Sequence, residues 1–131
     1  MRFLLDTNAL IALLKGHPEL TRRVRYHGLT DFGIPSIAIQ ELYFGALRSQ
    51  QRQTSLERIA HLRFEVLPFD KDDAARSGEI RAMLARAGTP IGLYDVLIAG
   101  QALSRGLTVV THNIREFARI TGLRVEDWQE A

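Results

Sequence analysis

The chain has 131 residues, of which 46% are hydrophobic and 24% charged, which is typical of one compact globular domain over residues 1–131. It has no cysteine, so disulfides, zinc–thiolate sites and a cysteine nucleophile are excluded. The net charge is only +2, so charge alone does not decide whether the partner is a polyanion. Asp6 interrupts the first apolar run and no run is long enough to span a membrane, so we expect a cytoplasmic protein without membrane contact.

Short apolar runs alternate with helical periodicity in the first half of the chain. The polar residues 6–8 suit a helix N-terminus, and Ser36 is a suitable N-cap. The pattern predicts, in order, a strand over 2–5, a helix from 6–8 to Gly16, a helix over 18–26, a strand over 32–34 and a helix following Ser36.

The second half repeats this alternation. The pattern predicts a helix over 56–64, a strand at 66–67, a helix from Asp70 to Gly88, a helix from 93 to Gly106, a strand over 107–111 and an edge strand at 124–125. Strands alternating with helices indicate an α/β fold, a three-layer α/β/α sandwich with a central, mainly parallel sheet. The functional crevice of such a sheet lies at the carboxyl ends of the strands, where we expect Asp6 and residues 111–113.

Three carboxylates lie in apolar surroundings: Asp6 after the first strand, Glu41 within a helix and Asp95 in the first turn of another. Each has an ordinary interpretation. Asp6 would be an N-cap, Glu41 an exposed residue paired with an arginine, and Asp95 a first-turn acid favoured by the helix dipole. If they gather in one crevice they repel one another unless a cation compensates. Oxygen ligands favour Mg²⁺ or Mn²⁺, and such sites suit phosphodiester hydrolysis.

Four segments in order strongly resemble the PIN-domain toxins of the VapC type. They are residues 4–8 (LLDTN), 39–45 (IQELYFG), 90–99 (PIGLYDVLIA) and 110–117 (VTHNIREF). The resemblance extends from Met1 to Trp128 and implies the toxin of a toxin–antitoxin pair. Such a toxin is an Mg²⁺-dependent endoribonuclease that cuts structured RNA, of the transfer or ribosomal class, and inhibits translation.

Carried over by position, the resemblance implies that Asp6, Glu41 and Asp95 are the catalytic and metal-binding acids. The supporting polar residues that we assign to the site are Thr7, Asn8, Thr111, Asn113 and Glu116. Many relatives have a fourth acid where this chain has Asn113, and Glu116 supplies that charge if the short helix after Asn113 turns it inward. The expected mechanism is in-line attack by water activated by the metal, with Glu41 or Asp6 accepting the proton.

The resemblance further implies a homodimer and a cognate antitoxin that inserts a segment into the active-site groove, often with a basic side chain. Arg81, Arg86, Arg105 and Arg115 are available to position RNA. Other interpretations stay open, namely a catalytically silent RNA-binding module on the same fold, a receiver-type signalling domain and a metal-dependent DNA nuclease. The receiver would need a lysine where the chain has Thr111 and His112. RNA and DNA nucleases share the same phosphodiester chemistry.

Overall fold

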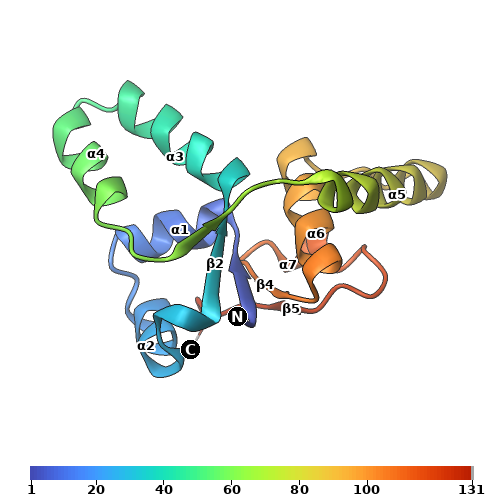
Figure 1. Cartoon of the computed structure of the whole chain (residues 1–131), viewed down its shortest axis with the longest axis horizontal. Coiled ribbons are helices and arrows are strands. Elements are labelled where there is room, and N and C mark those ends of the chain that lie inside the picture. The colour runs from blue at the N-terminus through green and yellow to red at the C-terminus, as the bar shows by residue number, and fades with distance from the viewer. Residues whose placement is uncertain (131) are drawn as a thin grey trace.

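A central parallel sheet organises the protein (Figure 1). The computed structural model describes residues 1–130. The strand order is β3-β2-β1-β4-β5, and each neighbouring pair is parallel. The strands are β1 (Phe3–Leu5), β2 (Phe32–Pro35), β3 (Glu65–Leu67), β4 (Thr108–Val110) and β5 (Val125–Glu126). The strand order reverses direction next to β1, so the crevice expected for such a sheet opens between β1 and β4.

Within the described residues 1–130, seven helices and one short 3₁₀ turn connect the strands, and helices cover both faces of the sheet. The predicted three-layer sandwich is thus confirmed. The helices are α1 (Thr7–Leu14), α2 (Pro18–His27), α3 (Ser36–Arg48), α4 (Arg52–Ala60), α5 (Lys71–Ala87), α6 (Leu93–Arg105) and α7 (Ile114–Phe117), and the 3₁₀ turn is Leu29–Asp31. None of the described helices is long and apolar enough to cross a membrane.

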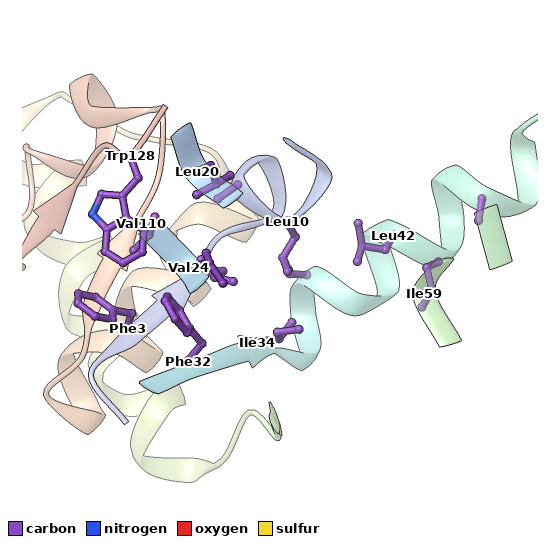
Figure 2. Packing of buried hydrophobic residues seen from close by; sticks show 14 residues of the cluster. Phe3, Leu10, Leu20, Val24, Phe32, Ile34, Leu42, Ile59, Val110 and Trp128 are labelled. Carbon is purple, nitrogen blue, oxygen red and sulfur yellow. The ribbon is translucent and has the colours of Figure 1, made fainter. Parts of the chain in front are cut away.

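Alternation along β1 separates two hydrophobic cores. Phe3 and Leu5 point into a core shared with α1 to α4, whereas Leu4 points into a core with α5, α6 and α7. Figure 2 shows the first core, where Trp128 lies edge-on to Phe3. Trp128 also stacks on His27, which is therefore a packing residue. The C-terminal segment is thereby held against β1 and α2.

Two predicted helix boundaries were wrong. The helix expected over 56–64 ends at Ala60, because the chain turns there to enter β3. Leu62 and Phe64 still pack against the first core, but from outside the helix. Ser36 is the first residue of α3 and Pro35 occupies the N-cap position without a side-chain hydrogen bond. Apolar periodicity predicted α4 but not the residue at which it ends, and capping preference predicted α3 but not the residue at which it begins.

A buried polar cluster joins α5 and α6. Asp73 is fully buried and pairs with Arg105, whose guanidinium also donates to the carbonyl of Pro68 at 2.7 Å. Burial would raise the pKa of Asp73, but the hydrogen bonds and charge of Arg105 keep it below its usual range. Arg105 is thus engaged within the fold, which contradicts its assignment as an arginine available for RNA.

Gly100 allows α5 and α6 to approach closely. A Cβ at this position would lie 2.8 Å from the backbone nitrogen of Ser77, so the helices would have to separate. We expect Gly100→Ala to lower the free energy of unfolding by about 1–3 kcal/mol in urea denaturation. The matched control is Gly78→Ala in α5, where a Cβ meets nothing within 4 Å. The control should stabilise the protein by about 0.5–1 kcal/mol, and an equal effect of both changes would contradict the packing argument.

Candidate active site

Asp6 lies at the point where the strand order reverses, directly after β1 and beside the end of β4. The residue is only 1% exposed. Oδ1 accepts a hydrogen bond from the amide of Ala9 at 2.8 Å, and Oδ2 accepts one from the hydroxyl of Thr111 at 2.5 Å. The first contact makes Asp6 the N-cap of α1, as its ordinary interpretation predicted. The second ties it to β4 and fixes its other oxygen at the crevice.

Glu41 reaches the same region from the middle of α3. It is half-buried, and its Oε1 accepts a hydrogen bond from the hydroxyl of Thr7 at 2.7 Å. Thr7 directly follows Asp6, so the residue that binds Glu41 is the chain neighbour of the other predicted acid, at the start of α1. The alternative of an exposed Glu41 paired with an arginine was wrong, since the partner of this carboxylate is a neutral hydroxyl.

Asp95 stands in the first turn of α6 and faces Glu116 of α7. Burial, the hydrogen bond with Glu116, and the charges of Asp6, Glu116 and Glu41 raise the pKa of Asp95 to about 7. A helix N-terminus by itself would lower this pKa, so burial and the neighbouring acids together outweigh the helix dipole here.

Glu116 is turned inward, toward Asp95. Asn113, three residues earlier, donates from Nδ2 to Glu116 at 3.2 Å, and its backbone amide donates to the Thr111 hydroxyl at 2.9 Å. Glu116 therefore stands where its charge acts on Asp95, while Asn113 orients it. Asn8 is exposed, and none of the hydrogen bonds found among residues 1–130 involves its side chain.

Asp127 is an acid of this region that the sequence did not single out. It follows β5, and its charge adds to that of Glu41 in raising the pKa of Asp6. Burial is the largest cause of that rise, and the hydrogen bonds from Thr111 and Ala9 oppose it. Asp127 lies 121 positions beyond Asp6 in the chain, and only the pairing of β4 with β5 brings it to this edge.

The acids are close enough to raise one another's pKa values, but their ligand atoms do not surround a single point. Within residues 1–130, one group of three His, Asp or Glu residues has ligand atoms all within 4.8 Å of one another, and it comprises His112, Asp127 and Glu130. The predicted acids Asp6, Glu41 and Asp95 are spread more widely. A hard divalent cation fits such a set, because Mg²⁺ keeps several water ligands and binds through one or two carboxylates. The donors are all oxygens, which disfavours zinc or iron.

Residues 3–123 match the PIN domain family. The chain belongs to the PIN-domain proteins of the VapC type. It is 46% identical over 130 residues to a protein named tRNA(fMet)-specific endonuclease VapC from Salmonella typhimurium, covering 98% of each chain. Named relatives of this family are endonucleases and ribonucleases, and this VapC-type chain is accordingly a nuclease.

Solved VapC-type structures share the fold. A structure of DNA-bound VapBC from Salmonella typhimurium superposes with a TM-score of 0.92 at 46% identity, covering 98% of each chain. A member of the VapBC family of toxin–antitoxin systems from Mycobacterium tuberculosis gives a TM-score of 0.73 at 27% identity, again with 98% coverage of each chain. The fold expected from the resemblance is therefore confirmed.

The raised pKa of Asp95 predicts a specific pH dependence of stability. The native state binds this proton more tightly than the unfolded chain, whose carboxyl has the ordinary pKa of 3.8. The contribution of Asp95 is thus full below pH 3.8 and is lost as the pH rises through about 7. In metal-free buffer we expect wild type to lose roughly 2–8 °C more melting temperature between pH 5 and pH 8 than Asp95→Asn does.

The matched control is Asp72→Asn, which removes an exposed acid from the first turn of α5. It should follow wild type across the pH range. Added Mg²⁺ should raise the melting temperature of wild type at pH 8 but not that of Asp95→Asn. Identical pH profiles for wild type and Asp95→Asn would show that the pKa of Asp95 is not raised in the folded protein.

Proposed function

We propose that the protein is a toxin that hydrolyses phosphodiester bonds of structured RNA with Mg²⁺, or Mn²⁺ in its place, and so inhibits translation in the cytoplasm. The main support is the gathering of Asp6, Glu41, Asp95 and Glu116 at the crevice between β1 and β4, where burial and the other three acids raise the pKa of Asp95. The similarity to an enzyme named for tRNA(fMet) makes transfer RNA the first substrate to test, with ribosomal RNA as the second.

The proposed ligands of the cation are Asp6, Glu41 and Asp95, with Glu116 as a further acid. When bound, the divalent cation would supply a Lewis acid for the phosphoryl group and activate water. Thr111 fixes the Asp6 carboxylate and Thr7 fixes that of Glu41, so both acids are held before substrate arrives. Glu41 or Asp6 then accepts the proton of the attacking water.

Other functions are less well supported. The strand order differs from the 2-1-3-4-5 order of receiver domains, so that alternative was wrong. A silent RNA-binding module would need positive charge, and acids crowded at the crevice instead disfavour phosphate unless a cation is present. A DNA nuclease uses the same chemistry, and substrate assays distinguish it.

We also propose that an antitoxin covers this site. A groove of about 320 Å³ runs between α1, α3 and α4 and has Glu41 in its wall. Its apolar residues include Ile11, Leu42 and Ile59. A partner segment with apolar side chains would fill this groove, and a basic side chain beside it would pair with the acids. The similarity to VapBC assemblies supports such a partner.

A homodimer is the expected quaternary state. Large apolar side chains are exposed on α3 and at the start of α6, namely Tyr43, Phe44, Leu47, Leu93 and Tyr94. Tyr43 and Phe44 do not pack into the core of this chain, and exposed aromatic side chains of this kind favour a contact with a second copy. The two helices that carry these exposed side chains, α3 and α6, contact each other.

The nuclease proposal predicts which side chains cleavage requires. With Mg²⁺ and without antitoxin, wild type should cut cellular RNA into discrete fragments, and chelator should abolish cutting. Asp95→Asn and Asp6→Asn should lower the cleavage rate at least about 100-fold. Loss of a group that only orients a metal ligand already costs about 10–100-fold, and these changes remove a proposed ligand itself. Thr111→Val, which removes only the hydroxyl bonded to Asp6, should fall in that 10–100-fold range.

Thr54→Val is the matched control, because Thr54 is exposed on α4. It should cut at the wild-type rate. Folded wild type that cuts no RNA with Mg²⁺ would overturn the proposal, and cutting of a DNA oligonucleotide in preference to the matched RNA would favour the DNA nuclease.

The antitoxin proposal predicts that filling the groove prevents binding. Gly45 lines the groove on α3, and a Cβ there would meet nothing within 4 Å. Gly45→Glu should therefore fold normally yet lose co-purification with the cognate antitoxin. Gly78→Glu places the same side chain on α5, outside the groove, and should keep the complex. Retention of antitoxin by Gly45→Glu would place the binding surface elsewhere.

A further inference from the structure

His112 and Asp127 meet at the catalytic edge of the sheet, although they are far apart in sequence. β4 and β5 are parallel with Val110 beside Glu126, and the amide of Thr111 donates to the carbonyl of Glu126 at 3.0 Å. The residues that follow the two strands therefore stand side by side. Thr111 itself donates to Asp6, so His112 is adjacent in the chain to a residue that touches the proposed catalytic acid.

Asp127 fixes the orientation of the His112 ring. Its Oδ2 lies 3.0 Å from Nδ1 of His112, and its Oδ1 accepts from the amide of Gln129 at 2.9 Å. An ionised carboxylate can only accept hydrogen bonds, so Nδ1 carries the proton of this contact. In the neutral ring Nε2 is then a lone-pair acceptor. The His112 side chain is 54% exposed and Asp127 only 17%, so the ring is accessible while its anchor is protected.

The surroundings of this ring favour a donor as its partner. Asp127 and Glu130 offer carboxylate oxygens, and both lie within 4.8 Å of His112 measured between ligand atoms. Phosphate oxygens can only accept hydrogen bonds, so they cannot bond to Nε2, which is itself an acceptor, and the nearby carboxylates repel their charge. A ribose 2′-hydroxyl can donate, and it is the group that distinguishes RNA from DNA.

We propose that Nε2 of His112, oriented by Asp127, accepts a hydrogen bond from a ribose 2′-hydroxyl beside the cleaved bond and so favours RNA over DNA. His112 is then a specificity residue, and Asp127 is a positioning residue that acts through it. This inference rests on the proposed RNA cleavage and adds the group by which the sugar is recognised.

The test compares all-ribose RNA with oligonucleotides that carry one 2′-deoxy or one 2′-fluoro substitution near the cleaved bond. Cleavage is measured at pH 8, where imidazoles are ordinarily neutral, with Mg²⁺ and without antitoxin. At one position, wild type should lose about 3- to 10-fold in kcat/KM with either substitution, which is the effect of one neutral hydrogen bond. Fluorine keeps the ribose-like sugar shape but cannot donate, so an equal loss with both substitutions assigns the effect to the donor.

Variants of His112 connect that loss to the ring. His112→Ala should cut all-ribose RNA about 3- to 10-fold less efficiently, and the 2′ substitution should then have no further effect. His112→Asn keeps a group near Nδ1 but not near Nε2 and should behave like Ala. His112→Gln reaches the Nε2 position and should restore part of the discrimination. Asp127→Asn keeps its oxygen on the amide of Gln129 and so donates to Nδ1, which moves the ring proton to Nε2. The ring can then only donate to the hydroxyl oxygen, so the equal loss with 2′-deoxy and 2′-fluoro RNA should disappear.

Distinct outcomes would overturn the inference. If His112→Ala keeps the wild-type sensitivity at every 2′ position, His112 does not contact the hydroxyl. If His112→Ala lowers cleavage of all-ribose and substituted RNA equally, the ring acts on another group. Both results leave the proposed RNA cleavage intact, whereas failure of wild type to cut all-ribose RNA removes the proposed function and this inference together. Unchanged melting temperatures of the His112 variants exclude a structural cause.

Discussion

Burial of the Asp6 carboxylate where the strand order reverses is the constraint on which the rest of the site depends. A charge removed from water is costly unless partners replace the lost hydration. Here the partners are the amide of Ala9 and the hydroxyl of Thr111, which come from α1 and from the end of β4. Neither supplies positive charge. Each contact also joins two elements of the fold, so the start of α1 and the β1–β4 pairing are fixed by the same side chain that faces the crevice.

A comparison of two buried acids shows why the crevice suits a cation. Asp73 is as buried as Asp6, but Arg105 pairs with it and lowers its pKa. Asp6 is surrounded by neutral donors and by further acids, and its pKa is raised by burial first, with Glu41 and Asp127 adding to the rise. Asp73 belongs to an ion pair that holds α5 on α6, whereas the groups that lower the pKa of Asp6 are the neutral donors Thr111 and Ala9. A metal ion or a basic side chain of a partner protein would satisfy the same need, which is why we propose that the cation and the antitoxin bind at the same place.

Much of the fold follows from local patterns. Apolar alternation, the N-cap at Asp6 and glycines after α5 and α6 predicted the strands and most helices, because these signals depend on neighbours a few residues away. Ends of elements were less certain, as at Ala60, where the turn into β3 stops the helix although apolar residues continue. A side-chain assignment failed where a distant residue decided it, because Arg105 is held by Asp73 rather than free for RNA.

The sequence by itself determined the alternating architecture, the three acids and their order along the chain, since each lies in a local pattern that survives without knowledge of the fold. Only the tertiary structure decided which groups surround those acids. It placed Glu116 against Asp95, gave Glu41 a threonine rather than an arginine as partner, and brought Asp127 to the side of His112. The physical reason is that strand order and helix packing set distances between residues far apart in the chain. The protonation of an acid and the orientation of a ring depend on those distances rather than on the residues beside them in sequence.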